Sequence, residues 1–337
     1  MKIKVCYIIF LICTIGQAQL VIDESLTPEE LVQNVLVDPA SVTPTNITLA
    51  GGASDVVRLN VARFFTNFNP TNLGLDEGVI LATGRTTLAI GPNDQSNATL
   101  SAPNTALSDA DLQMISSFPI VSATILEFDF VATGEELNFD FVFASEEYPE
   151  FVGDTYNDSF GFFISGPGLS GPFSNSAQNI ALIPNTTTGI AVSTVNNGNA
   201  NVGPCMNCEY YINNGQGNTP AVNSTIQYDG FTTVLKAIAP LQCGETYHIK
   251  LAIGNVSDNA YDSAVFLKNF RIAPLELVDN LNLSENTNVC FGETITIDSN
   301  LTIGTNMFVW TRNGAPIPES GPSISVTEGG LYALTVL

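Results

Sequence analysis

Basic side chains are scarce in this sequence, and their scarcity excludes several kinds of partner. The 337 residues include 10 Lys and Arg against 33 Asp and Glu, for a formal net charge of -23. Nucleic acids and anionic membranes are bound through clustered Lys and Arg, so we expect neither a nucleic-acid partner nor a basic membrane anchor. The one His, His248, shares an alternating segment with Lys250, and we interpret it as a surface residue of a half-buried strand rather than as a general base.

Long apolar runs are also absent, except near the N-terminus. Lys2 and Lys4 precede an apolar run over residues 5–15, which is followed by Gly16-Gln17-Ala18. This order is typical of a secretory signal peptide, and the run is too short for a permanent membrane span. We therefore expect a secreted or cell-surface protein with no transmembrane segment in the mature chain.

The composition favours strands over helices. The chain has 27 Gly, 18 Pro and 20 Phe, while the helix-forming basic residues are few. Apolar residues alternate with a period of two in several short stretches, namely residues 126–130, 137–143, 160–164 and 247–253. We predict an all-β fold, a large jelly-roll-like β-sandwich with one or two short helices.

Two short helices are indicated by capping signals. Thr27 can cap a helix that starts at Pro28, and Glu30 can complete a capping box. A second helix is predicted to begin at Ser108, with Asp111 three residues later.

The last part of the chain has a different pattern. Four short apolar segments near residues 294–297, 307–310, 323–326 and 331–334 are spaced as in immunoglobulin-like modules. This module ends one strand short, so we expect a truncated immunoglobulin-like domain whose Cys290 has no nearby partner. The predicted divisions are a signal peptide at 1–18, an N-terminal segment at 19–44, the sandwich at 45–272, a linker at 273–287 and the partial domain at 288–337.

One long stretch carries acidic residues without any basic side chain. Residues 86–235 contain 15 Asp and Glu and no Lys, Arg or His. Uncompensated carboxylates repel one another, and a hard cation such as calcium binds six to eight oxygens, so we hypothesise a calcium site. Its candidate ligands are Glu146, Glu147, Asp154, Asp158, Asp229, Asp258 and Asp262. The alternatives are a solvated acidic loop, or counter-ions supplied through the fold by Lys236, Lys250, Lys268 or Arg271.

Cysteines in the sandwich allow three interpretations. Cys205, Cys208 and Cys243 are the candidates, and export to an oxidising compartment favours at least one disulfide among them. A zinc site of these three thiols with His248 has a suitable number of ligands. Free thiols are the third possibility.

Catalysis has weak support. Glu146 or Glu147 would have to serve in a polysaccharide hydrolase, which needs two carboxylates across a cleft. Neighbouring residues of an extended strand point to opposite faces, so these two would do different jobs. The single Trp, Trp310, lies outside the predicted sandwich.

Four motifs in order carry a family resemblance. They are Phe143-Ala144-Ser145-Glu146-Glu147-Tyr148 with Asn157-Asp158-Ser159-Phe160-Gly161-Phe162, then Tyr228-Asp229-Gly230-Phe231, then Cys243-Gly244-Glu245-Thr246-Tyr247, and then Tyr261-Asp262-Ser263-Ala264-Val265. With these motifs the sequence resembles the choice-of-anchor L domain of bacterial surface proteins over residues 45–272. A departure is Gly254-Asn255-Val256, where relatives tend to have Ala-Asp.

The resemblance implies location more than activity. Such domains occur in exported proteins with varied C-terminal anchoring, and a following immunoglobulin-like module is similar to long surface proteins of Bacteroidetes that use type IX secretion. We therefore expect an exported, non-enzymatic module at the outer surface of a Gram-negative bacterium. Its expected partner is a glycan or another surface protein, and calcium is expected to stabilise its acidic loop.

Overall fold

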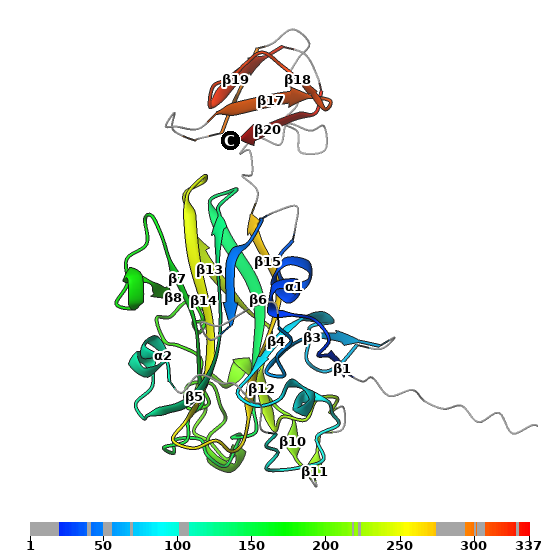
Figure 1. Ribbon diagram of the computed structural model, residues 1–337, viewed down its shortest axis with the longest axis vertical. Helices are drawn as coiled ribbons and strands as arrows, with labels where there is room; N and C mark the ends of the chain where they lie inside the picture. The colour runs from blue at the N-terminus through cyan, green and yellow to red at the C-terminus, as the bar shows by residue number, and fades with distance from the viewer. Residues whose placement is uncertain are drawn as a thin grey trace, which may run out of the picture.

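The computed structural model is an all-β molecule, as predicted (Figure 1). It describes residues 20–38, 42–49, 56–67, 70–100, 108–217, 219–221, 224–273, 294–299, 301, 307–327 and 330–337. The expected signal peptide, most of the linker and Cys290 lie outside the described residues. Within the described part of the chain, no helix has the length and apolar character that crossing a bilayer requires.

Two antiparallel sheets form the sandwich. The eight-stranded sheet has the order β1 (Leu20–Asp23), β3 (Val61–Thr66), β4 (Glu77–Ala82), β15 (Ser263–Ala273), β6 (Glu136–Ser145), β12 (Gly230–Thr232) and β9 (Tyr211–Asn213), and β13 (Leu235–Pro240) also pairs with β6. The five-stranded sheet has the order β2 (Thr45–Leu49), β5 (Ile120–Val131), β14 (Thr246–Val256), β7 (Ser159–Ser165) and β8 (Gln178–Asn179). A short hairpin of β10 (Gly215–Gln216) and β11 (Thr219–Pro220) lies apart from both sheets.

Alternation along β6 divides its side chains between two cores. Phe139, Phe141 and Phe143 are buried in the larger core with residues of β7. There the ring centroids of Phe139 and Phe162 are 4.7 Å apart, a distance typical of packed aromatic pairs. The intervening Val142 and Ala144 belong to a second core on the other face of the sheet. The period of two thus assigns each β6 residue to a face.

Short helices join the strands. They are α1 (Pro28–Leu31), the π-helical η1 (Val32–Leu36), α2 (Ala110–Ile115) and the 3-10 turns η2 (Thr86–Ala89), η3 (Ser174–Ser176), η4 (Asn199–Asn201) and η5 (Cys208–Tyr210). The capping box of Thr27 and Glu30 is present. The cap of α2 is Asp109 rather than the expected Ser108, because the Asp109 carboxylate accepts hydrogen bonds from the backbone of Asp111 and Leu112.

The C-terminal strands lie within two residues of their predicted positions. They form one pair, β16 (Ile295–Asp298) with β19 (Ser323–Val326), and one triplet, β18 (Ala315–Pro316), β17 (Phe308–Arg312) and β20 (Tyr332–Val336). Trp310 is fully buried among them and donates a hydrogen bond from Nε1 to the Gly321 carbonyl at 2.8 Å. Trp310 is therefore a core residue of this part of the chain.

Candidate acidic site

Strand register places three carboxylates side by side at one end of the eight-stranded sheet. Ser145, the last residue of β6, is paired with Ser263 of β15 and with Gly230 of β12. Because both pairings are antiparallel, the next residue, Glu146, lies opposite Asp262 on one side and Asp229 on the other. The backbone N–H of Glu146 donates to the Asp262 carbonyl at 3.1 Å. We call Glu146, Asp229 and Asp262 the carboxylate row.

The row lies on the face of the second core. Glu146, Asp229 and Asp262 each stand two residues from a member of that core, Ala144, Phe231 and Ala264, and strand residues two apart share a face. Relative exposure is 0% for Glu146 and Asp229 and 2% for Asp262. Like charges opposite each other across strands destabilise a sheet, and burial removes the water that would screen them.

The segment from Asn93 to Leu100 covers the row and satisfies part of it. The backbone N–H of Ala98 donates to Glu146 Oε2 at 3.2 Å, and that of Leu100 donates to Asp262 Oδ2 at 2.7 Å. Asn93 Nδ2 donates to Asp229 Oδ1 at 2.7 Å. Each carboxylate of the row therefore keeps one oxygen bound to this segment.

Two carboxylate oxygens in the row have no partner. Within the described residues, Glu146 Oε1 and Asp229 Oδ2 accept no hydrogen bond. The hydroxyl of the adjacent Tyr228 also has no hydrogen-bond partner there. All three residues are fully buried. An unsatisfied buried polar group costs about 1–3 kcal/mol, and more when it is charged. The row therefore needs either protons or a cation.

The electrostatics of the row agree with this geometry. Burial, followed by the negative charge of Asp229, raises the pKa of Glu146 to about 9. Burial likewise raises the pKa of Asp229 to about 7, with a contribution from Glu150, and the pKa of Asp262 to about 6. Burial and the charges of Asp262 and Glu146 also raise the pKa of Tyr228. The Gln227 side chain and the Gly217 backbone offset part of the rise, for Glu146 and Asp229 respectively, and among the described residues no cationic side chain contributes.

Glu147 forms a separate pair with Asp158. Glu147 Oε2 accepts a hydrogen bond from the Asp158 backbone at 2.9 Å, and Asp158 Oδ2 accepts one from Ser263 Oγ at 2.7 Å. Burial raises the pKa of both carboxyls, that of Glu147 to about 8. Residues 146 and 147 thus serve different clusters, although both lie in the turn that follows β6 and not on the extended strand that we expected.

The remaining two predicted ligands stand alone. Asp154 is exposed and accepts a hydrogen bond from the Thr155 backbone at 2.6 Å. Asp258 accepts one from the Ala260 backbone at 2.9 Å. The seven candidates therefore divide into the carboxylate row, the Glu147–Asp158 pair and two single residues.

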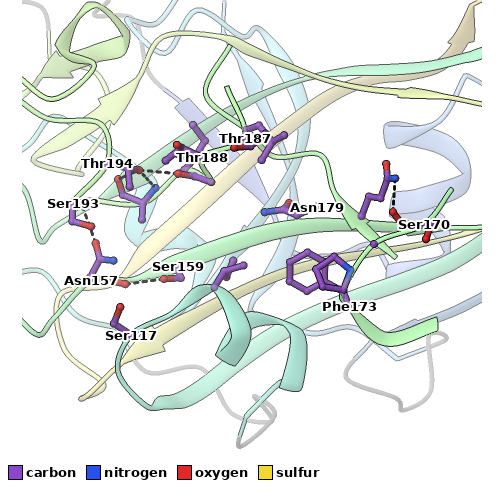
Figure 2. A pocket seen from close by; sticks show the side chains of 18 residues that line it. Ser117, Asn157, Ser159, Ser170, Phe173, Asn179, Thr187, Thr188, Ser193 and Thr194 are labelled. Atoms are coloured by element: carbon purple, nitrogen blue, oxygen red, sulfur yellow. Dashed lines mark hydrogen bonds between the residues drawn. The ribbon is translucent and has the colours of Figure 1, made fainter. Parts of the chain in front are cut away.

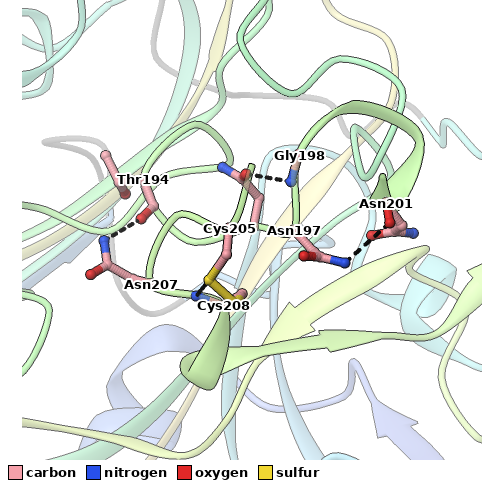
Figure 3. Close-up of a disulfide and its surroundings, with 8 residues drawn as sticks. Thr194, Asn197, Gly198, Asn201, Cys205, Asn207 and Cys208 are labelled. Atoms are coloured by element: carbon pink, nitrogen blue, oxygen red, sulfur yellow. Dashed lines mark hydrogen bonds between the residues drawn. A yellow bond between two sulfur atoms is a disulfide. The ribbon is translucent and has the colours of Figure 1, made fainter. Parts of the chain in front are cut away.

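Two of the three candidate cysteines form a disulfide. Cys205 and Cys208 are joined in a disulfide (Figure 3). Cys243 is a free, half-buried thiol. Cys205, Cys208 and Glu209 are the one set of three potential ligands within 4.8 Å of one another in the described residues. Two of those ligands are bonded to each other, and His248 instead contacts Asp129 through Nδ1 at 2.6 Å. Among the described residues, the three thiols and His248 therefore do not come together as the zinc alternative requires.

Sequence reasoning overlooked two residues that complete the acidic end. Asn93 holds Asp229, and Tyr228 lies beside the row with its hydroxyl unpaired. Asn93 sits in an Asn-rich stretch that resembles any polar loop, so no signal marks it. Tyr228 directly precedes Asp229 in one of the quoted motifs, and this position next to a candidate ligand could have marked it as part of the site.

The packed antiparallel sheets and the buried carboxylates at one end define a β-sandwich module with an acidic end. The chain belongs to the choice-of-anchor L domain family, whose model matches residues 20–271. The match begins at β1, so it covers the segment at 19–44 that we expected to precede the domain. A search of curated proteins found no match. Membership in this family fits a surface-associated or secreted module without enzymatic activity.

Proposed function

We propose that this chain is a non-enzymatic module displayed at the outer surface of a Gram-negative bacterium, where it binds a glycan or another surface protein, and that calcium stabilises its acidic end. The family assignment supports the surface role. The Lys-flanked apolar run at residues 2–15 supports export, and the resemblance to Bacteroidetes surface proteins favours type IX secretion.

The unpaired oxygens of Glu146 and Asp229 are the observation that carries the calcium proposal. Calcium prefers carboxylate and carbonyl oxygens and tolerates irregular geometry. Glu146 and Asp229 face the same side of adjacent strands, so one ion between them would satisfy both oxygens and remove their repulsion. Asp262 would contribute negative charge rather than a ligand in this geometry, because the oxygens of the three row carboxylates are not all within 4.8 Å of one another, and backbone carbonyls and waters would complete the shell.

The basic residues that could have served as counter-ions have other partners. Arg85, which precedes the acidic stretch, pairs with Glu24 at 2.7 Å. The four others that we considered bind elsewhere, Lys236 to Asp140, Lys250 to Asp109 and Asp111, Lys268 to Asp76, and Arg271 to Asn138. These partners support a bound cation over a counter-ion brought through the fold.

A polysaccharide hydrolase is the less favoured alternative. Glu146 and Glu147 are 0% and 1% exposed, so neither reaches a substrate in this conformation. They also belong to separate clusters with different hydrogen-bond partners, whereas glycoside hydrolysis needs two carboxyl groups flanking one bond.

Calorimetric titration of metal-free protein with calcium chloride tests the site. We expect binding that Glu146→Gln and Asp229→Asn each weaken at least tenfold. Asp154→Asn is the matched control, because it makes the same substitution at an exposed aspartate outside the row, and it should bind as the parent does. Absence of binding by the parent chain, or undiminished binding by both row variants, would overturn the proposal.

A further inference from the structure

A groove on the five-stranded sheet is a feature that the acidic site does not explain. It has a volume of about 680 Å³ and is bordered by β7, β8, the end of α2 and the segment around residues 187–194 (Figure 2). We call it the β7–β8 groove. Its volume lies within the range of small-molecule sites, roughly 300–1,000 Å³.

The lining of the β7–β8 groove carries no charged side chain, although the chain as a whole has a net charge of -23. Ser and Thr hydroxyls and Asn and Gln amides make up its polar part. A charged ligand would leave its hydration shell without gaining an ionic partner there. The lining therefore suits a neutral ligand with many hydrogen-bonding groups.

Two asparagine side chains present unused donors to the groove. Asn157 Oδ1 accepts a hydrogen bond from the Ser193 backbone at 2.8 Å, and Asn179 Oδ1 accepts from the Phe162 and Ala181 backbones at 3.1 and 3.0 Å. These bonds fix which way each amide faces and leave its Nδ2 group without a partner in the described structure. Figure 2 places both amides at the groove, where they are available to a ligand.

Apolar side chains complete the lining, and one of them, Phe173, is aromatic. Phe173 is half-buried, and its ring packs against Phe163 with a centroid distance of 4.8 Å. The backbone N–H and hydroxyl of Ser174 both donate to Asp111 Oδ1 at 2.8 Å, which ties the segment carrying Phe173 to α2. The ring is thus held in place beside the polar groups.

From these features we infer that the β7–β8 groove binds a neutral oligosaccharide. Sugar hydroxyls accept from amides and donate to hydroxyls without needing charge, and a sugar's apolar face packs on an aromatic ring. A peptide added as a strand is the weaker alternative, because β8 offers an edge of only two residues. The inference deepens the proposed surface-binding function and rests on it.

Asp substitutions test the donors without disturbing the backbone bonds. Asn157→Asp and Asn179→Asp keep the Oδ1 acceptor and replace the Nδ2 donor with a charged oxygen. Asn213→Asp is the matched control, because Asn213 is exposed outside the groove and its Oδ1 also accepts from a backbone N–H, that of Gly215 at 2.9 Å. Thr187→Trp, at an exposed lining position, blocks the groove independently of the amides.

The experiment screens the purified chain against neutral gluco-, galacto-, manno- and xylo-oligosaccharides, with oligogalacturonates as charged comparison, and measures the affinity of any hit by calorimetry. We expect a neutral hit that Asn157→Asp, Asn179→Asp and Thr187→Trp weaken about tenfold or more and Asn213→Asp leaves unchanged. No neutral hit at millimolar concentration, preference for the charged sugars, or a hit unaffected by all three groove variants would overturn the inference. Running the assay in calcium and in chelator separates its failure from failure of the calcium site.

Discussion

Lys250 Nζ lies 2.5 Å from Asp111 Oδ2, so the first turn of α2 is fastened to the middle of β14 by a buried ion pair. Asp109 Oδ2 is the second partner, at 2.8 Å, and the three side chains are only 2–11% exposed. Burial opposes the lysine charge, but hydrogen bonds to Asp109 and Asp111 outweigh it and raise the pKa of Lys250. Asp111 also holds the Phe173 segment of the groove, because it accepts a hydrogen bond from the Ser174 backbone.

Replacing Lys250 with Met should destabilise the protein by about 3–5 kcal/mol, because two buried carboxylates lose their counter-ion. Adding Asp109→Asn and Asp111→Asn to Lys250→Met should recover part of that loss. Urea unfolding of the parent, single and triple variants measures both effects. A Lys250→Met loss below 1 kcal/mol would show that the pair contributes little to stability.

His248 should give the chain a small pH dependence of known sign. Its hydrogen bond to Glu127, and then that to Asp129, raise its pKa above the ordinary 6.5. The contribution is therefore fully present below pH 6.5 and is lost as pH rises through the raised pKa. Because the ring is partly exposed, the contribution should be below about 1 kcal/mol. The difference in unfolding free energy between parent and His248→Gln should shrink between pH 6 and pH 9, and a difference that grows with pH would contradict this assignment.

The disulfide should contribute modestly to the free energy of unfolding. Cys205 and Cys208 are separated by three positions in the chain, and closing so short a loop is worth roughly 2 kcal/mol or less in the chain-entropy model. Peptide mapping without reductant should recover a Cys205–Cys208 link and an alkylated Cys243. Cys205→Ser with Cys208→Ser should lower unfolding stability by no more than that amount, whereas Cys243→Ser should leave the mapped link intact. A link that includes Cys243, or three free thiols, would refute the pairing.

Local patterns predicted the local parts of the fold. Alternation assigned Phe139, Phe141 and Phe143 to one face, and the capping box identified α1, because both depend on residues adjacent in the chain. The cap of α2 was misplaced by one residue because Ser108 and Asp109 are both good capping residues and only the backbone geometry chooses between them.

The membership of the acidic site depended on strand order, which the sequence did not disclose. Glu146 meets Asp229 and Asp262 only because β6 lies between β12 and β15, strands that are far from it in sequence. Asp154 is also a carboxylate and is closer to Glu146 in the chain, yet it sits in an exposed loop. Charge counting therefore found the region but could not separate the carboxylate row from its neighbours.

Protons are the principal competitor of calcium in the row, and they make a distinct prediction. An acid whose folded pKa is raised contributes stability that is fully present below its unfolded pKa and is lost as pH rises through the folded value. With pKa values of about 6, 7 and 9 for Asp262, Asp229 and Glu146, the metal-free protein should lose stability between pH 5 and pH 9. Calcium should offset that loss.

Thermal melting of the full chain at pH 8, in calcium and in chelator, tests the central claim most directly. Calcium at about 100 times its dissociation constant should add roughly 2.7 kcal/mol, which corresponds to roughly 5–10 °C in Tm for a domain of this size. The shift should persist in Asp154→Asn and fall to about half or less in Asp229→Asn, which should melt at or above the parent in chelator because a like charge is gone. Identical parent melting temperatures in calcium and chelator at pH 8 would contradict the account.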